Sequence, residues 1–441
     1  MDTFNEDQNT AFQEIIAGKN VFLTGAGGTG KSYFIHVLIE ALLARNVRPA
    51  LTAMTGCAAI LLSRPELKAK TLHSWAGVGL GKEPVSDLIY KIRRNGRSTK
   101  NWLTTDILII DEISMMTPDL LEKLDEIGKK IRRNPDKPFG GIQLLLVGDF
   151  FQLPPIITKA EASPSKKIFA FQSSLWDTII DTTVELRQIK RQADERFQDL
   201  LTAARFGRLE PRHEEMLRAC IGRPWQKNQI KPTLLFSRRY EVDKINQANL
   251  AALKGERHSY TPGLLFNGDK PAALKEEDPD FKVAVSKLDS EAAYDTELTL
   301  IVGSQVMLIK NMDTDSRLVN GSRGVVTGFA EGPKHFPIVK FLCGKIMTME
   351  EQGWPIDGYE KFAKRTQVPL RLAWAVTIHK SQGSTLDCAL IDIGDSTFEY
   401  GQAYVALSRV RDLESLYIHE FDPKAVRAHP LVLAQFTREE A

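Results

Sequence analysis

The chain has 441 residues, of which 43% are hydrophobic and 26% are charged, and its formal net charge is +2. This composition is typical of a soluble globular protein with apolar material for roughly three domains of ordinary size. No apolar run approaches the ~20 residues of a membrane span. The acidic start of the chain lacks the basic and apolar stretches of a signal peptide. These features argue against a membrane protein, and we expect a cytoplasmic chain with no membrane partner.

The cysteines and the net charge narrow the classes further. Cys57, Cys220, Cys343 and Cys388 lie at least 45 positions apart, which argues against a zinc cluster and against a disulfide framework. We therefore expect a reducing environment. Because the net charge is small, a polyanionic partner must be bound by local basic patches rather than by the overall field.

The first predicted element is an amphipathic helix near the start of the chain. Residues 4–8 read as a short cap, and apolar residues then follow at helical spacing up to Ile16. Gln8 lies 17 positions before the glycine-rich loop described next. It is either a solvated helix residue or a contact to an adenine edge, since an amide can both donate and accept along one edge.

The most informative stretch is GAGGTGKS at residues 25–32. It follows the apolar run 21–23 and precedes the apolar run 33–39, so a buried strand leads through it into a helix. Glycines let the backbone direct successive N–H groups inward, and a helix start adds partial positive charge. Lys31 would reach the outer phosphates and Ser32 would ligate a metal ion. We expect ATP and Mg²⁺ to be bound here by Gly25, Gly27, Gly28, Thr29, Gly30, Lys31 and Ser32.

Polar residues follow the next predicted strand, 49–54. Thr55 and Gly56 open a helix at its carboxyl end, and the cluster at residues 71–75 contains His73 and Ser74. Ligands gather at the carboxyl ends of strands in open α/β sheets, so these residues are candidates for contacting a second ligand. Ordinary helix-start residues are the alternative.

Residues 90–102 carry five basic residues between two aromatic ones. They are either a solvated face or a basic loop that contacts a nucleic-acid backbone.

Two adjacent carboxylates end the apolar strand 107–110. Asp111 is placed to hold Mg²⁺, usually through water, and Glu112 to activate a water aligned on the γ-phosphate. A second acid favours hydrolysis over kinase chemistry. After a predicted amphipathic helix at 119–133, the strand 142–147 leads into GDFFQLPP, where Gln152 is placed to sense the γ-phosphate.

Together these motifs resemble a known family. The order GAGGTGKS, TGCAA, TLHSWAG, DEIS and GDFFQLPP is similar to RecD-like helicases of superfamily one, and EKLDEIGKKIRRNPDKPFGGIQ at residues 122–143 resembles the signature of the petite integration frequency (Pif) DNA helicases. The signature is specific, whereas the other motifs recur across many helicases. The resemblance also favours the adenine contact of Gln8.

The downstream half agrees with this resemblance. VEL at residues 184–186 with KRQ at 190–192 resembles motif IV, although Lys190 stands where the family usually has an aromatic residue. TIHKSQGST at 377–385 resembles motif V, and YVALSR at 404–409 resembles motif VI. The resemblance implies charge donors at Arg191 and Arg409 and a nucleotide contact at Gly383. It also implies DNA contacts at Thr55, Gly56, His73, Ser74, Thr377, His379 and Lys380.

The predicted fold class is α/β. We expect a first RecA-like domain at residues 1–185 with a small wedge-like protrusion at 71–105, and a second RecA-like domain at 186–252 and 369–441. Strands at 182–186 and 370–373 are expected to belong to the second domain. Alternating strands between 253 and 368 predict an inserted antiparallel barrel, for which the resemblance implies a Src-homology-3-like fold. Residues 269–281 are polar enough for a mobile loop.

The resemblance implies an ATP-dependent helicase that moves 5′ to 3′ on single-stranded DNA, with hydrolysis in a cleft between the two RecA-like domains. We expect a monomer whose partners are single-stranded and forked DNA, with G-quadruplex DNA as a further candidate. An RNA helicase and a nucleotide-switched binding module are the alternatives. Arg409→Ala is expected to stop hydrolysis and to leave folding nearly intact.

Overall fold

The computed structural model describes residues 4–64, 67–155, 167–225, 230–267, 276–292, 294–312, 318–356, 358–359 and 362–437. The chain forms two compact units: unit 1 comprises Met1–His213, Glu399–Ser408 and Val426–Ala441, and unit 2 comprises Glu214–Phe398 and Arg409–Ala425. Each unit has its own sheets and apolar core. Within the described ranges, every helix is too short or too polar to cross a bilayer.

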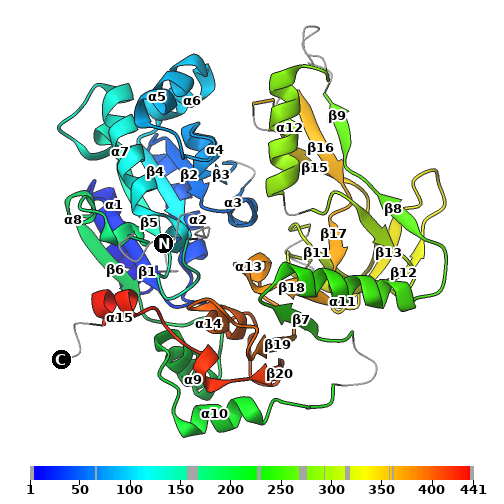
Figure 1. Ribbon diagram of the computed structural model, residues 1–441. Helices are drawn as coiled ribbons and strands as arrows, with labels where there is room; N and C mark the ends of the chain where they lie inside the picture. Colours follow the sequence, from blue (N-terminus) through cyan, green and yellow to red (C-terminus); the bar gives the residue numbers. More distant parts are fainter. Residues whose placement is uncertain are drawn as a thin grey trace. The chain divides into compact units, whose positions relative to one another are not determined.

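Unit 1 is built on a six-stranded parallel sheet in the order β3-β2-β4-β5-β1-β6 (Figure 1). Predicted strands at 49–54, 107–110 and 142–147 are confirmed. The strands are β1 (Val21–Gly25), β2 (Pro49–Ala53), β3 (Lys70–Thr71), β4 (Ile107–Asp111), β5 (Gln143–Val147) and β6 (Thr182–Leu186).

Helices cover both faces of this sheet, which explains its unbroken apolar strands. Phe22 and Leu146 face one core, and their neighbours Leu23 and Leu145 face the other. The helices of unit 1 are α1 (Glu6–Ile16), α2 (Lys31–Ala44), α3 (Gly56–Leu62), α4 (Leu72–Ala76), α5 (Val85–Arg94), α6 (Gly96–Thr104), α7 (Pro118–Arg132), α8 (Trp176–Ile179), α9 (Glu195–Phe206), α14 (Gln402–Leu407) and α15 (Pro430–Phe436), with 3-10 turns η1 (Ile113–Met115), η2 (Pro138–Gly141) and η3 (Ala170–Gln172).

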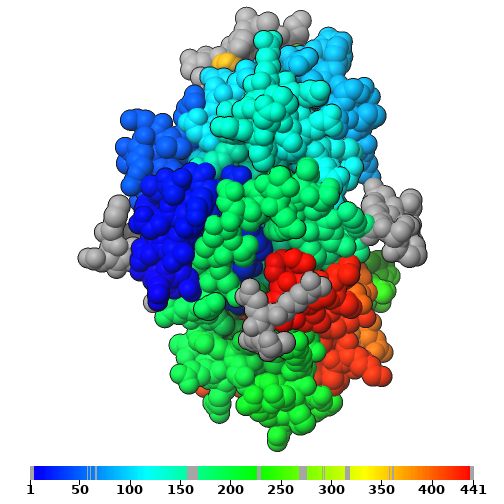
Figure 2. Space-filling view, turned by 90° about the vertical axis from the view of Figure 1, so that its left-hand side faces the viewer, coloured from blue at the N-terminus to red at the C-terminus, as the bar shows by residue number. Residues whose placement is uncertain are grey.

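The end of the chain returns to unit 1. The ring of Phe436 stacks on Phe150 with centroids 5.4 Å apart and lies 6.1 Å from Phe22, so α15 closes the aromatic core beside β1. Figure 2 shows this red segment on the surface next to green segments of unit 1.

The helix α7 and the turn η2 form one tightly interlocked piece. The backbone N–H of Phe139 donates to Asp125 Oδ1 at 2.8 Å, and Arg132 Nε donates to Gly140 O at 2.9 Å. Gly128 lies directly against this turn, because a Cβ built on it would be 2.7 Å from the carbonyl carbon of Phe139. The residues that resemble the Pif signature are therefore those that lock this helix to the turn before β5.

Unit 2 contains a four-stranded parallel sheet in the order β18-β7-β19-β20. Its elements are β7 (Thr233–Phe236), β18 (Ala375–Thr377), β19 (Ala389–Ile393), β20 (Leu416–Phe421), α11 (Arg239–Ala252), α13 (Ile378–Ser381) and η4 (Pro423–Ala425). The helix α10 (Pro211–Arg218) begins in unit 1 and ends in unit 2.

The rest of unit 2 is largely antiparallel, as the alternating strands predicted. The sheet orders are β14-β13-β12-β11-β17, β15-β16-β9 and β10-β8. The elements are β8 (His258–Tyr260), β9 (Gly263–Phe266), α12 (Pro279–Glu291), β10 (Leu298–Leu300), β11 (Gln305–Leu308), β12 (Arg323–Phe329), β13 (Pro337–Phe341), β14 (Ile346–Thr348), β15 (Gln352–Pro355), β16 (Ala363–Gln367) and β17 (Leu370–Leu372). The α/β fold class is confirmed, and the three-domain division remains a prediction.

Two predicted strands belong to other sheets than expected. The strand β6 pairs with β1 in unit 1, because Asn20 donates through its side chain to Ile179 O at 2.8 Å and through its backbone to Asp181 at 2.7 Å, just before β6 begins. The strand β17 pairs antiparallel with β11, because Leu370 is buried in the core of the five-stranded sheet together with Val306.

One predicted loop is helical instead, and another is described only in part. The basic stretch 90–102 lies on α5 and α6 rather than on a loop, because Asn95 accepts from the N–H of Ser98 at 3.1 Å and starts a new helix. Of the loop predicted at 269–281, residues 269–275 lie outside the described residues, and α12 begins at Pro279.

Replacing Gly128 by alanine should lower the free energy of unfolding by about 1–3 kcal/mol, because the new methyl group would overlap the backbone of Phe139. The matched control is Gly96→Ala at the start of α6, where a Cβ meets nothing within 4 Å and alanine favours the helix. Urea denaturation followed by circular dichroism compares the two. Equal unfolding midpoints for both variants would show that the α7–η2 contact is loose.

Candidate active site

The loop between β1 and α2 turns at glycines with positive φ. Gly25, Gly28 and Gly30 have φ of 140°, 90° and 93°, a region that other residues rarely adopt. A Cβ on Gly25 would also lie 2.5 Å from the backbone oxygen of Leu186 in β6. No side chain caps α2 at Gly30, so the first N–H groups of this helix are the donors that an anion would meet. Ser32, in the first turn of α2, is exposed.

Lys31 is the first residue of α2, and its side chain folds back over the loop. Its Nζ donates to the carbonyl oxygens of Gly25 at 2.6 Å and Ala26 at 3.0 Å. Burial lowers the pKa of this lysine, and the nearby carboxylates of Asp149 and Asp111 oppose the effect. The ammonium group is therefore held between the loop and the acids that follow β5 and end β4.

The predicted acids and Gln152 lie at the same edge of the sheet, because β4, β5 and β1 are neighbours. Burial raises the pKa of Asp111 to about 6, although the N–H of Glu112 and the charge of Lys31 both lower it. Glu112 adopts a left-handed conformation with φ of 59° and donates its N–H to Asp111 Oδ1 at 2.9 Å. The N–H of Gln152 donates to Asp149 O at 2.9 Å, which places Gln152 in a turn just beyond β5.

Gln8 lies against the loop, as its predicted role requires. Its side chain is fully buried, and a Cβ on Gly30 would be 3.2 Å from its Nε2. Its Oε1 accepts from Asn5 N at 3.2 Å, whereas Nε2 has no hydrogen-bond partner within the described part of the chain. Thr29 is also buried, and its Oγ1 donates to Ala26 O at 2.9 Å. A buried amide nitrogen beside the loop that has no partner among the described residues is suited to a polar base edge.

Arg191 is also beside the loop. The carbonyl of Gly28 accepts from the backbone N–H of Lys190 at 2.9 Å and of Arg191 at 3.2 Å. Arg191 Nη1 donates to Ser408 O at 3.2 Å. The backbone bonds are independent of the side chain at position 190, so the departure from the family's aromatic residue does not displace Arg191.

The predicted DNA contacts of unit 1 lie at two neighbouring helix starts. Thr55 and Gly56 follow β2, and Thr71 ends β3 and caps α4, which carries His73 and Ser74. Thr71 Oγ1 accepts from Ser74 N at 3.3 Å. Because β2 and β3 pair side by side, both helix starts lie at the edge that also carries the phosphate loop.

A second group of predicted residues lies together in unit 2. Thr377 ends β18, and its Oγ1 accepts from Lys380 N at 3.2 Å to cap α13. Burial lowers the pKa of His379 on the same helix. Gly383 has φ of 77° and follows α13 in an exposed turn.

Arg409 holds this turn together. Its side chain is 2% exposed, and Nη1 donates to Ser384 O at 3.2 Å and to Ser381 O at 3.4 Å. We therefore correct the expectation that folding would tolerate Arg409→Ala, because the truncation would leave two carbonyl groups without this donor.

Unit 1 thus brings together Lys31, Asp111, Glu112, Gln152, Arg191, Gln8 and the phosphate loop, and unit 2 brings together Arg409, Gly383, Thr377, His379 and Lys380. Sequence reasoning missed three buried residues of unit 1, namely Asp149, Arg205 and Tyr404. Asp149 and Tyr404 lie inside recognised motifs, which was a usable signal, whereas Arg205 lies in a helix that no motif marks.

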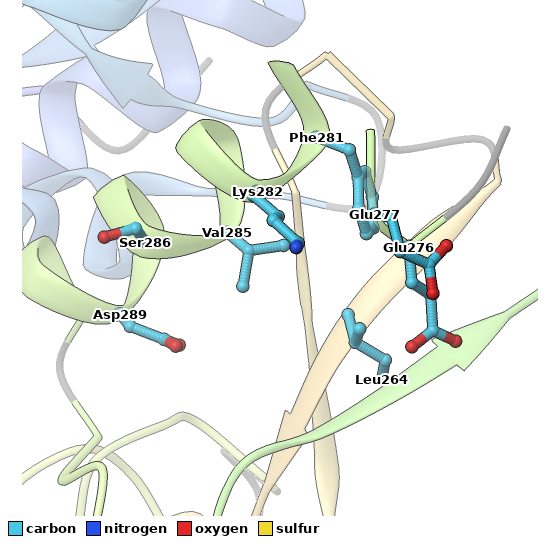
Figure 3. A pocket seen from close by; sticks show the side chains of 8 residues that line it. All are labelled: Leu264, Glu276, Glu277, Phe281, Lys282, Val285, Ser286 and Asp289. Carbon is cyan, nitrogen blue, oxygen red and sulfur yellow. The ribbon is translucent and has the colours of Figure 1, made fainter. Parts of the chain in front are cut away.

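A pocket of about 450 Å³ lies elsewhere, between α12 and β9 of unit 2 (Figure 3). It is lined by the apolar side chains of Leu264, Phe281 and Val285 and by acids such as Glu276 and Glu277. None of the predicted site residues lines it. The loop and strand ends, rather than this pocket, carry the candidate chemistry.

Two family models match the chain. The model described as "PIF1-like helicase" matches residues 3–214, and the model described as "DNA helicase Pif1, 2B domain" matches residues 285–329. Among curated proteins, the chain is 40% identical over 428 residues to an ATP-dependent DNA helicase PIF1 of Xenopus laevis, covering 97% of this chain and 63% of the relative. The chain therefore spans a little under two thirds of the length of that relative.

Solved structures of Pif1 helicases are similar to this chain along most of its length. The crystal structure of Pif1 helicase from Candida albicans has a TM-score of 0.79 and 36% identity, covering 99% of each chain. The crystal structure of Bacteroides Pif1 bound to ssDNA has a TM-score of 0.68 and 30% identity, covering 98% of this chain and 96% of the other.

Replacing Asp111 by asparagine should raise the free energy of unfolding at pH 7.5 by about 1–3 kcal/mol, without nucleotide or magnesium. The folded pKa of about 6 lies above the unfolded value, so the contribution of Asp111 to stability falls as the pH rises from about 4 through 6, whereas asparagine makes no such pH-dependent contribution. Melting temperatures across this range measure the difference, which should vanish near pH 4.

The matched control is Asp106→Asn, which should lower the free energy of unfolding at pH 7.5 instead of raising it. Its hydrogen bonds to Arg48 lower the pKa of Asp106, so that carboxylate adds stability at neutral pH that is lost as the pH falls. An Asp111→Asn variant that melts at or below the parent temperature at pH 7.5 would show that burial does not penalise the ionised carboxylate of Asp111.

Proposed function

Because the chain belongs to the Pif1-like helicase family, we propose that it is an ATP-dependent DNA helicase that moves 5′ to 3′ on single-stranded DNA. The observation that carries the proposal is the meeting of Lys31, Asp111, Glu112 and Gln152 at one edge of a parallel sheet. A phosphate loop with two acids beside it is suited to hydrolysis of a nucleoside triphosphate. The direction of movement rests on the family resemblance.

We assign the steps of hydrolysis to this chain's side chains as follows. Lys31 and the loop N–H groups bind the phosphates, and Gln8 binds the adenine edge. Glu112 takes a proton from the attacking water, and Gln152 senses the γ-phosphate. Arg191 and Arg409 neutralise charge on the transferring group.

Asp111 and Ser32 fit a magnesium ion. The carboxylate of Asp111 is buried, and its raised pKa shows that the site disfavours an uncompensated negative charge. A divalent cation beside Asp111 would favour the ionised carboxylate. The exposed Ser32 hydroxyl lies in the first turn of α2, directly after the phosphate loop, and could supply a second oxygen ligand. The ion would neutralise charge on the phosphates of the bound nucleotide.

The DNA strand is assigned to the helix starts of both units. Thr55, Gly56, His73 and Ser74 in unit 1 and Thr377, His379 and Lys380 in unit 2 all lie at carboxyl ends of parallel strands or on the helices that follow them. The relative from Bacteroides has been crystallised with ssDNA. Forked DNA and G-quadruplex DNA are further proposed substrates, and we propose that the chain acts as a monomer.

ATP hydrolysis rates with and without single-stranded DNA test the proposal, and matched DNA and RNA duplexes test the substrate. A large stimulation by DNA together with DNA unwinding supports a DNA helicase. Unwinding of RNA alone would make it an RNA helicase, and hydrolysis that single strands do not stimulate would make it a nucleotide-switched binding module.

Replacing Glu112 by glutamine should reduce DNA-stimulated hydrolysis by about 10²- to 10⁴-fold, because the variant lacks the general base. Nucleotide binding should persist, since glutamine keeps the shape of the side chain. Lys31→Ala is the comparison variant and should weaken nucleotide binding itself. Steady-state hydrolysis and equilibrium titration with labelled ADP measure the two effects. A Glu112→Gln enzyme close to the parental rate would remove this residue as the base.

Neutralising Arg93, Arg94 and Arg97 on α5 and α6 should flatten the salt dependence of single-strand binding. Each phosphate contact contributes about −0.7 to the slope of log affinity against log salt. Fluorescence anisotropy at several salt concentrations measures the slope. The control neutralises three exposed arginines on or beside α9 and α10, namely Arg196, Arg208 and Arg212. Equal slopes for the parent and the α5–α6 variant would make that stretch a solvated face.

A further inference from the structure

Three buried side chains from different parts of unit 1 interact with one another, and one of them bonds the phosphate loop. Asp149 follows β5, Arg205 lies on α9 and Tyr404 lies on α14, and their exposed fractions are 1%, 7% and 2%. Figure 1 shows α14 beside α9, although they are far apart in the sequence. None of the three has a role in the proposed hydrolysis so far.

Arg205 and Asp149 form a forked ion pair. Arg205 Nη2 donates to Oδ1 at 3.0 Å and Nε donates to Oδ2 at 3.1 Å. The guanidinium also lies over the rings of Phe151 at 4.7 Å and Phe206 at 5.2 Å. Burial alone would lower the pKa of Arg205, but Asp149, together with Tyr404 and Glu185, outweighs burial and holds it above its usual range. The guanidinium therefore stays charged, and its fork and ring contacts fix the orientation of the Asp149 carboxylate.

Asp149 in turn shapes the segment that carries Gln152. Its Oδ1 accepts from the N–H of Phe151 at 3.2 Å, and its carbonyl oxygen accepts from the N–H of Gln152 at 2.9 Å. A carboxylate that Arg205 holds in place thus defines the turn after β5. The position of the proposed γ-phosphate sensor depends on this turn.

Tyr404 joins that turn to the phosphate loop. Its Oη donates to Asp149 Oδ2 at 3.4 Å and accepts from the N–H of Gly27 at 2.7 Å. Gly27 belongs to the loop that we propose binds phosphate, and it is buried. The phenol hydroxyl therefore bridges the loop backbone and the carboxylate that organises the Gln152 turn.

The other anchors of the loop do not involve Tyr404. Lys31 bonds the carbonyls of Gly25 and Ala26, and the carbonyl of Gly28 accepts from the backbone of Lys190 and Arg191. Loss of the hydroxyl should therefore leave the loop formed. Loss of the hydroxyl removes the two hydrogen bonds that join Gly27 of the loop to the Asp149 carboxylate.

We propose that Tyr404, Asp149 and Arg205 are positioning residues that hold Gln152 in register with the phosphate loop. The inference rests on the proposed function and deepens it, because it identifies what aligns the γ-phosphate sensor with the bound nucleotide. Binding of the nucleotide depends on the loop and Lys31, whereas hydrolysis also depends on the alignment. The bridge therefore acts on kcat and on binding of a transition-state analogue, with little effect on binding of ADP.

The test variant is Tyr404→Phe, which removes the hydroxyl and keeps the ring. The net value of one hydrogen bond predicts a decrease in kcat of about 2- to 12-fold, with the KM for ATP within about twofold of the parent. Affinity for ADP with aluminium fluoride and magnesium should fall by a similar factor, while affinity for ADP stays within about twofold. The matched control is Tyr260→Phe, which removes a hydroxyl that donates to His335 O at 2.6 Å within unit 2. It should change none of these values.

A double-mutant cycle separates positioning from a purely structural role. If Tyr404 acts through Gln152, adding Tyr404→Phe to Gln152→Ala should produce little further loss of kcat. Arg205→Lys keeps the charge but loses the fork, and it should fall between the parent and Arg205→Ala in kcat. Thermal melting of each variant shows that it is folded at the assay temperature.

The outcomes distinguish this inference from the proposed function. Parental hydrolysis that DNA does not stimulate would overturn the helicase proposal, while the comparison of aluminium fluoride complexes with ADP still tests the bridge. A Tyr404→Phe variant with parental kcat and parental affinity for the analogue would overturn the inference alone. Additive losses in the double mutant would also overturn it, because they would show that Tyr404 acts independently of Gln152.

Discussion

The candidate site of unit 1 depends on one constraint, the pairing of parallel strands in a sheet that is buried on both faces. Parallel strands present all their carboxyl ends at one edge, and the register of β4, β5 and β1 makes three of those ends neighbours. The phosphate loop, the two acids and the Gln152 turn each extend from one of these ends. Because apolar side chains cover both faces of the sheet, the strands cannot shift register without exposing core residues. The strand ends that carry the site are therefore held in fixed positions relative to one another.

Burial at this edge divides the charged groups into two kinds. Arg205 satisfies Asp149 within the protein through a forked ion pair, so this carboxylate is committed to holding the structure. Burial raises the pKa of Asp111 although the N–H of Glu112 and the charge of Lys31 lower it, so its charge is costly until a further cation approaches. Burial similarly disfavours the charged form of Lys31 and lowers its pKa, and its ammonium group bonds the loop carbonyls. The edge thus uses one acid to hold the structure, and the other is the acid that we propose holds magnesium.

Unit 2 also presents candidate side chains at the carboxyl end of a parallel strand, although they differ from those of unit 1. Its parallel sheet also ends in a capped helix start, where Thr377 leads into α13. The buried side chain of Arg409 donates hydrogen bonds to two backbone carbonyls, one at the end of α13 and one in the turn that follows it. The arginine that the family resemblance marks as a charge donor is therefore also a structural residue. A substitution there changes folding and chemistry together, and stability must be measured beside activity.

The sequence by itself determined the local parts of this protein. The apolar runs beside GAGGTGKS predicted a strand, a loop and a helix, and the apolar run before Asp111 and Glu112 predicted a strand that ends in two acids. The apolar periodicity of residues 119–133 and 142–147 predicted α7 and β5, because each of these elements depends on backbone conformation and side-chain pattern within a short window. Only the tertiary structure decided that β6 joins the first sheet, that β17 joins an antiparallel one and that Arg409 is buried. It also decided the bridge from Arg205 through Asp149 and Tyr404 to Gly27. Asp149 and Tyr404 are 255 positions apart, and a hydrogen bond at that separation depends on how distant segments pack, which no local pattern records.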